Sequence, residues 1–197
     1  MAQIDKKTRF GSDVSYSEFE DDGTLQFIGS ATVWDDQMVD IGAGKLPAVG
    51  APSWTSYKGG QVLSFADAQT NTVYFNVQIP HSYKLDTNID FHCHVVHASN
   101  SGGFSTWQFT YCLASIGGTF TTATTSLVTL TAPAVVDHHG LLIFPNITGT
   151  GAGISSMILC SLERHGNSGT YNGAIYIMSM DSHYEKDSIG SRQELAK

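Results

Sequence analysis

The chain has 197 residues, 41% of them hydrophobic, which is enough for one domain with a sizeable core. Charged residues make up only 14% of the chain, below the usual value of about a quarter, which argues against long solvated helices. The formal net charge of −8 disfavours direct binding to nucleic acid and to anionic lipid, because both carry negative charge.

Residues 1–23 are polar and end in an acidic run, so they predict an extended N-terminal arm that orders against a neighbour. The first residues lack the apolar segment of a signal peptide. No stretch approaches the roughly 20 apolar residues of a membrane span. We therefore expect a chain that is made in the cytoplasm, stays there unless it leaves by lysis, and is not inserted in a membrane.

The next part of the chain begins with a short predicted strand over residues 24–28 and continues as a long irregular loop over 29–60. The loop is rich in Gly and Pro, and it contains Trp34 and Trp54, whose large side chains need a cover. Loops of this length in compact domains are usually functional or interfacial. We expect it to wrap over the domain or onto a partner.

Beyond residue 60, eight segments rich in Val, Ile, Thr, Tyr and Phe are separated by turn signals and predict strands. They are 61–65, 72–79, 89–97, 104–114, 120–131, 138–144, 155–164 and 173–184. This spacing, without a helical period, predicts an all-β fold: a two-sheet antiparallel sandwich of the jelly-roll type, with an N-terminal arm and a long loop. The sandwich domain is expected over 24–184, followed by a polar C-terminal tail over 185–197.

The last predicted strand, 173–184, is apolar on both faces, which indicates that both faces are covered. Ile175 and Ile177 point to one side of the expected sheet, and the alternate apolar residues point to the other. The second cover would come from another chain or from the loop 29–60. The residues that we assign to an interface with another chain are Trp34, Trp54, Tyr176, Met178 and Met180.

The three cysteines, Cys93, Cys112 and Cys160, each lie in an apolar, strand-like run. Their odd number and the absence of a CxxC spacing argue against a disulfide framework and against a zinc knuckle. Buried reduced thiols are therefore expected.

Histidines provide the candidate metal ligands. His92 and His94 share one face of a predicted strand, and this H-x-H pair resembles the metal motif of cupins. Cupins also need a glutamate a few residues later, which is absent here. The histidines that could supply a third ligand are His81, His97, His138, His139 and His183. We predict no metal and no cofactor. If a metal is bound, His92 and His94 are the candidate ligands. Otherwise we expect the imidazoles to form hydrogen bonds across strands or subunits.

No catalytic motif is found in the sequence. There is no G-x-S-x-G nucleophile elbow, and the glycines of 149–153 precede a strand-like run instead of a helix. The adjacent acids Asp35 and Asp36 point to opposite faces of a strand and so do not form a glycosidase pair. We therefore predict no catalytic residue and no enzyme activity. Aromatic residues such as Trp34 and Trp54 could form a platform on which sugar rings stack, so sugar binding remains an alternative.

Six segments, taken in order, resemble a group of virion proteins of tailed bacteriophages. These segments are 33–40, 77–84, 89–97, 107–120, 154–164 and 181–194. The group carries a PH…HxHW centre, a strand that begins with Trp and ends in an iGg.F pattern, and an ending similar to DSHYEKDSIGSRQE; this chain lacks the aromatic residue after the second His.

The resemblance implies a structural role in a virion. Small jelly-roll phage proteins of this kind act as capsid cement or decoration proteins, as homotrimers on the capsid surface that bind the major capsid protein. They also act as head-fibre or tail-associated proteins, which implies a host surface glycan as an alternative partner. A further alternative from the H-x-H pair is a cupin-like metal-binding enzyme that uses His92 and His94.

Overall fold

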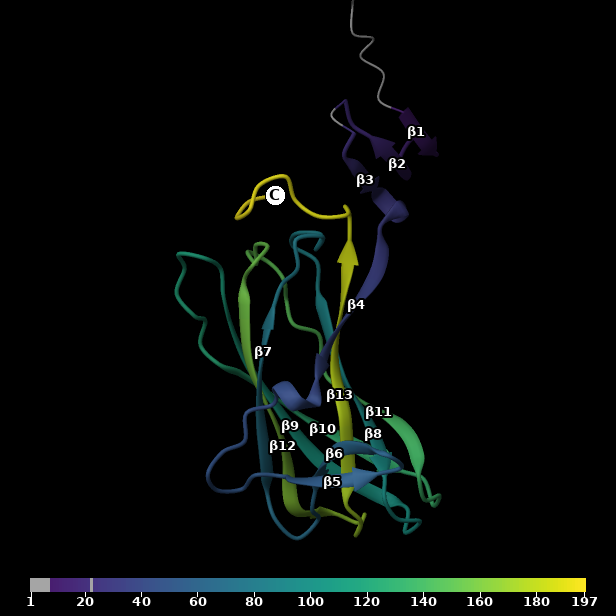
Figure 1. Ribbon diagram of the computed structural model, residues 1–197, viewed down its shortest axis with the longest axis vertical. Helices are drawn as coiled ribbons and strands as arrows, with labels where there is room; N and C mark the ends of the chain where they lie inside the picture. Colours follow the sequence, from purple (N-terminus) through teal and green to yellow (C-terminus); the bar gives the residue numbers. More distant parts are fainter. Residues whose placement is uncertain (1–7, 22) are drawn as a thin grey trace, which may run out of the picture.

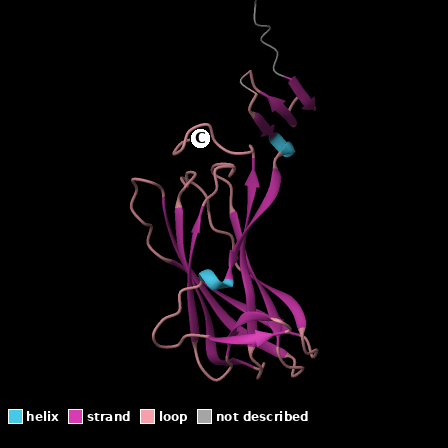
Figure 2. Cartoon of the chain, viewed as in Figure 1, coloured by secondary structure: helices cyan, strands magenta, loops and turns pink. Residues whose placement is uncertain are grey.

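The structure is a computed structural model that describes residues 8–21 and 23–197. Strands dominate this part of the chain (Figure 2). They form two antiparallel sheets that face each other, together with a small three-stranded sheet that projects from one end of the molecule (Figure 1). The predicted all-β fold, a two-sheet antiparallel sandwich, is therefore confirmed.

One layer is a four-stranded sheet with the order β10-β9-β12-β7. Its strands are β7 (Asn71–Gln78), β9 (Gly103–Ala114), β10 (Thr124–Ala132) and β12 (Met157–Gly169). The other layer has the order β11-β8-β13-β6-β5, and β4 pairs with β13 beyond the end of β6. Its strands are β4 (Val33–Asp40), β5 (Ser53–Tyr57), β6 (Gly60–Phe65), β8 (Ile89–His97), β11 (His138–Ile143) and β13 (Ile175–Lys186).

The strand pairs are nested along the chain. β9 pairs with β10, β8 with β11, β7 with β12 and β6 with β13, all antiparallel. This is the pattern of one long hairpin rolled into two layers, which is the jelly-roll topology. The eight strands predicted beyond residue 60 are all present, with ends that shift by a few residues.

The core lies between the two layers and is rich in aromatic side chains. Trp107 of β9 packs against Phe65 of β6 with ring centroids 5.1 Å apart, and Phe109 packs against Phe91 of β8 at 5.5 Å. These four side chains are at most 1% exposed. Alternation explains their burial, since on β9 every second residue from Ser105 to Phe109 is buried and the intervening ones are only partly covered.

β13 carries a bulge that corrects one sequence-based prediction. Ile177 lies opposite Val95 and Ser179 lies opposite the next residue of β8, so Met178 is an extra residue in the ladder. The bulge reverses the alternation, and Met180 points into the core with 0% exposure. The assignment of Met180 to an interface is therefore wrong, because it followed an uninterrupted alternation from Ile175.

The segment 29–60, predicted as an irregular loop, contains two strands. β4 and β5 lie within it, together with the short 3-10 helices η1 (Gly29–Ala31) and η2 (Ile41–Ala43). β4 has a mixed sequence, VWDDQMVD, and one of its residues, Val39, is buried. The Tyr57 ring of β5 packs 5.3 Å from the ring of Tyr176, so part of the outward side of β13 is covered by the chain itself.

The N-terminal arm forms a small sheet instead of an extended lead-in. Its strands are β1 (Thr8–Gly11), β2 (Tyr16–Phe19) and β3 (Leu25–Ile28), while residues 1–7 and 22 of the predicted arm lie outside the described part. The strand predicted over 24–28 thus belongs to this sheet and not to the sandwich. It joins the C-terminal end of the sandwich through a bridge from Gln26 to Ser188 and through the Phe27 amide, which donates to the Asp187 carbonyl (2.7 Å).

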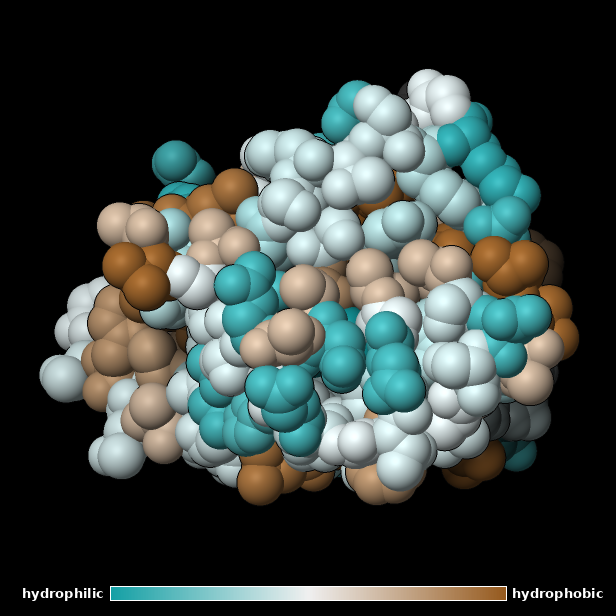
Figure 3. Space-filling view, turned by 90° about the horizontal axis from the view of Figure 1, so that it is seen from below, coloured by the Kyte–Doolittle hydropathy of each residue, from teal (hydrophilic) through white to brown (hydrophobic). Residues whose placement is uncertain are grey.

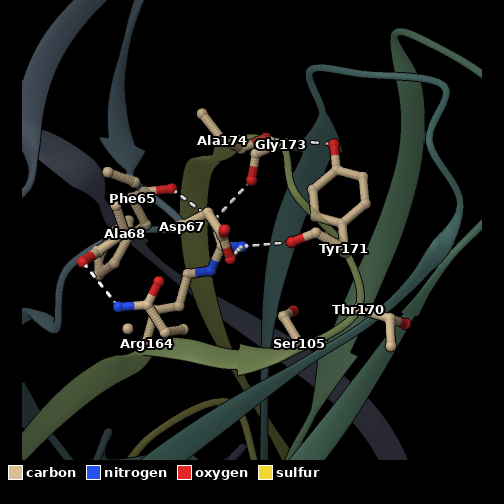
Figure 4. A network of polar contacts seen from close by, with 12 residues as sticks. Phe65, Asp67, Ala68, Ser105, Arg164, Thr170, Tyr171, Gly173 and Ala174 are labelled. Atoms are coloured by element: carbon tan, nitrogen blue, oxygen red, sulfur yellow. Dashed lines mark hydrogen bonds and ion pairs between the residues drawn. The ribbon is translucent and has the colours of Figure 1, made fainter.

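A buried arginine lies at the centre of a network of polar contacts (Figure 4). Arg164 of β12 is 0% exposed, and its Nη1 donates to the carbonyls of Phe65 and Gly173, each at 2.8 Å. Its Nη2 donates to the Tyr171 carbonyl at 3.3 Å and meets Asp67 Oδ1 at 3.2 Å. One side chain therefore ties the exit of β6 to the loop that leads into β13.

Two of the cysteines are fully covered in this arrangement. Cys93 and Cys160 are buried in the core, as expected, while Cys112 is half-buried. In the described part of the chain no helix is long and apolar enough to cross a membrane.

Candidate functional site

The outer face of the six-stranded layer brings together four histidines and two aspartates from adjacent strands. On β8, Phe91 and Cys93 point into the core, so His92 and His94 point outward. Residues opposite one another in an antiparallel ladder share a face, which extends this face to β11, β13 and β4. We call it the histidine face, defined by Trp34, Asp36, Met38, His92, His94, His139, Leu141, Ile143, Asp181 and His183.

At the centre of the histidine face, three side chains from two adjacent strands converge. His94 Nε2 lies 2.8 Å from Asp181 Oδ2 and 3.3 Å from His92 Nε2. His92 Nε2 lies 3.5 Å from the same carboxylate oxygen. The side chains of His92 and Asp181 are 10% and 11% exposed, and that of His94 is 30% exposed. The cluster is therefore half sunk in the sheet and opens toward solvent at His94.

The bulge at Met178 is what makes this cluster possible. Without the extra residue, Asp181 and His183 would lie on the same side of β13 as Ile177 and would enter the core. With it, Asp181 lies opposite His92 on the outer face. The residue that sends Met180 inward thus also sends a carboxylate outward to two imidazoles.

Further polar groups surround the three side chains. His94 Nδ1 lies 2.8 Å from His139 Nε2 on β11. On the other side, the His183 ring stands edge-on to His92 with centroids 4.7 Å apart, and its Nε2 meets Asp36 Oδ1 of β4 at 2.7 Å. The Nδ1 of His94 and the Nε2 of the flanking His183 therefore have partners on the two neighbouring strands, β11 and β4.

Burial favours the neutral form of the His92 imidazole. Burial lowers the pKa of His92, and the neighbouring His183 acts in the same direction, while Asp181 opposes both. A neutral imidazole keeps a lone pair that can accept a hydrogen bond or bind a metal. Asp181 Oδ1 is buried and has no hydrogen-bond partner among the described residues. The cluster thus offers two imidazole nitrogens and one carboxylate to a cation.

The sequence predicts no bound metal, but two of these three side chains are its candidate ligands. His92 and His94 were the predicted candidates, and they do converge, but the third donor is Asp181, which was not among the candidates considered. Its signal is the Asp-Ser-His spacing of 181–183, which places an acid and a histidine on one face of a strand. This spacing does not show that Asp181 lies beside His92, because that contact depends on the pairing of β8 with β13.

The histidines considered as a third ligand are spread over the molecule. His139 and His183 border the cluster. His97 points to the core side of β8, where its ring contacts Tyr171. The ring centroid of His138 lies 5.9 Å from that of His97. His81 lies elsewhere, between Ser155 and Ser191, which it contacts at 2.9 Å and 2.7 Å.

The predicted interface residues do not form one patch. Trp34 lies on the histidine face and is 58% exposed, whereas Trp54, at 46%, shares its face of the sheet with the core residue Leu63. Tyr176 is half-buried and Met178 is half-buried, and Met180 lies in the core. Only Trp34 and Trp54 of the five therefore remain well exposed.

A separate groove lies between the small N-terminal sheet and the C-terminal tail, lined by Gln26, Ser188 and Arg192 among others. None of the cluster residues lines it. At the opposite end of the molecule, Figure 3 shows apolar side chains in separate spots between polar ones. The histidine cluster is thus distinct from this groove.

Comparisons with known proteins found distant structural similarity but no family for this chain. No family model matches the chain, and no curated protein does. Among solved structures, TmCBM61 in complex with β-1,4-galactotriose is 10% identical with a TM-score of 0.35, covering 79% of this chain and 88% of that one. The xylan-binding module CBM15 is 13% identical with a TM-score of 0.39, covering 78% and 99%. The CBM22-1–GH10 modules of Clostridium thermocellum Xyn10B are 9% identical with a TM-score of 0.41, covering 76% and 28%.

Proposed function

We propose that this protein is a structural, non-enzymatic component of a tailed-phage virion, acting on the capsid surface as a cement or decoration protein. In this role it would form a homotrimer and bind the major capsid protein. The ordered motifs that resemble phage virion proteins support the proposal. Three of them, 33–40, 89–97 and 181–194, cover the adjacent strands β4, β8 and β13 and the chain that follows β13.

The observation that carries the proposal is the small N-terminal sheet. It has three strands of four residues each, and it projects from the sandwich (Figure 1). A three-stranded sheet needs a hydrophobic face or a packing partner for independent stability. Phe10 and Phe19 of this sheet are 64% and 44% exposed. These features suit an arm that docks on another protein, as attachment to a shell requires.

Exposed apolar residues of the sandwich supply a second contact surface. On the histidine face, Met38 and Ile143 are 67% and 64% exposed, and Leu141 is 44% exposed. They flank the histidine cluster on β4 and β11. Contacts repeated around a symmetric shell need only modest buried area in each copy and need no active site.

The experiment is binding of the purified protein to emptied, expanded capsids of the phage that encodes it, with the mass of the free protein measured by light scattering. The expected results are a trimer in solution and saturable binding to capsids. A full-length variant with Phe10→Ser and Phe19→Ser should lose binding at least tenfold with unchanged melting temperature. Leu127→Ser, at an equally exposed site on β10, is the matched control. A monomer that does not bind capsids would contradict the proposal.

A second candidate is a head-fibre or tail-associated protein that binds a host surface glycan. The observation that favours it is Trp34, which is 58% exposed on the same face as Asp36 and His183, because sugar sites combine an aromatic platform with polar groups. Trp34→Ala should abolish retention on a column of host surface polysaccharide. Equal retention of the wild type and of this variant would remove the candidate.

A further inference from the structure

We propose that His92, His94 and Asp181 bind one divalent transition-metal ion of the zinc type, which would link β8 to β13 at the centre of the histidine face. This goes beyond the proposed virion role, and it can be tested on the purified protein alone.

The separations of the three donor atoms match a metal triangle. Zinc binds imidazole nitrogen and carboxylate oxygen at about 2.0–2.2 Å, so neighbouring donors in a tetrahedral site lie about 3.3–3.5 Å apart and in an octahedral site about 3.0 Å apart. The three observed separations are 2.8, 3.3 and 3.5 Å. A cation between these atoms therefore requires only small movements of the side chains.

The donor chemistry agrees with this geometry. Two imidazoles and one carboxylate on one side of an ion form a set used for zinc and for other divalent transition metals, with open positions on the other side. The three groups carry one negative charge when both imidazoles are neutral. Asp181 Oδ1, which is buried without a hydrogen-bond partner among the described residues, could complete a bidentate carboxylate.

A neighbouring group orients one of the two histidine ligands in the way that metal sites use. Ligating histidines usually donate their second ring N–H to a neighbouring acceptor, which fixes the tautomer. If His94 binds through Nε2, its Nδ1 carries the proton and donates to His139 Nε2 at 2.8 Å. His183 stands against the His92 ring and is held by Asp36, so it supports the site from outside the triangle.

The open side of the site faces solvent, since the side chain of His94 is 30% exposed. A water molecule or a donor group from another molecule can take the free position. The ion would therefore join two strands of one chain and remain accessible to a partner.

The experiment is calorimetric titration of untagged, EDTA-treated protein with ZnCl2, together with the visible absorption of the Co2+ form. We expect one ion per chain, a Co2+ spectrum of tetrahedral or five-coordinate type, and a higher melting temperature with Zn2+. Asp181→Asn and His94→Gln should abolish stoichiometric binding. His139→Ala should weaken binding about 10–100-fold, because it removes the acceptor behind a ligand.

His165→Gln is the matched control, since His165 lies on β12 of the other sheet and pairs with Glu163. It should bind zinc as the wild type does. Melting curves in EDTA show whether each variant is folded, which separates loss of a ligand from loss of structure. Binding below about 0.1 equivalents by the wild type, or unchanged binding by folded Asp181→Asn and His94→Gln, would overturn the inference. A zinc-binding protein that fails to bind capsids would contradict only the proposed virion role.

Discussion

Replacing Arg164 with leucine is expected to destabilise the protein by about 3–4 kcal/mol, because buried carbonyl groups lose their donors. The two shortest contacts, to the Phe65 and Gly173 carbonyls at 2.8 Å, lie in the protein interior. Each buried acceptor left without a donor costs about 1–3 kcal/mol, so the two together account for roughly 2–6 kcal/mol. Part of this loss is offset because leucine carries no charge that must be kept out of water.

The assay is urea unfolding followed by tryptophan fluorescence, with the free energy of unfolding extrapolated to water. Arg164→Lys is the informative comparison. It keeps the positive charge but lacks the planar fork that reaches several carbonyls at once, so it should lose about half as much stability. A leucine variant within about 1 kcal/mol of the wild type would refute the reasoning, since it would mean that the loops relax and find other donors.

Three further predictions follow from the fold. Met180→Ala should cost about 2–5 kcal/mol in urea unfolding, because it empties core volume, and a loss below 1 kcal/mol would contradict the bulge. The pKa of Asp35 is lowered mainly by its hydrogen bond with Lys186. Ionised Asp35 should therefore add at most about 1 kcal/mol to the free energy of unfolding at this partly exposed site, and this stabilisation should be present above the ordinary pKa of an aspartate. It should disappear as the pH falls through the lowered value, and the melting temperature of Asp35→Asn should not show this component. In native protein at pH 8, Cys112 should react with a thiol reagent well before Cys160, whose pKa burial raises to about 12; equal rates would refute this.

The sequence contained enough information for the eight strands beyond residue 60 and for β3, but not for β1, β2, β4 and β5. The β9 segment alternates Trp107 and Phe109 with polar residues, so its period alone reveals a strand with one buried face. β4 has no such pattern, because it pairs with β13 at the edge of the sheet and buries little of its own surface. Tertiary pairing, not local preference, makes it a strand.

The candidate site was found in part for the same reason. His92 and His94 are recognisable together because two residues on one strand share a face whatever the strand pairs with. Asp181 joins them through a cross-strand pairing and a bulge, and neither can be read from local sequence. The same bulge led the sequence-based alternation to expose Met180 and to overstate the apolar surface that one chain leaves uncovered.

The bulge at Met178 also bears on which insertions and deletions the chain can accept. Loss of that single residue would leave most of the composition of β13 intact, yet it would turn Met180 toward solvent and drive Asp181 into the apolar interior. A substitution in this strand changes stability through one side chain, whereas a deletion or insertion exchanges the buried and exposed faces of all the residues that follow it. The most permissive places for inserted residues or tags are the surface turns, such as the one at Gly117, and not any point between Ile175 and Tyr184.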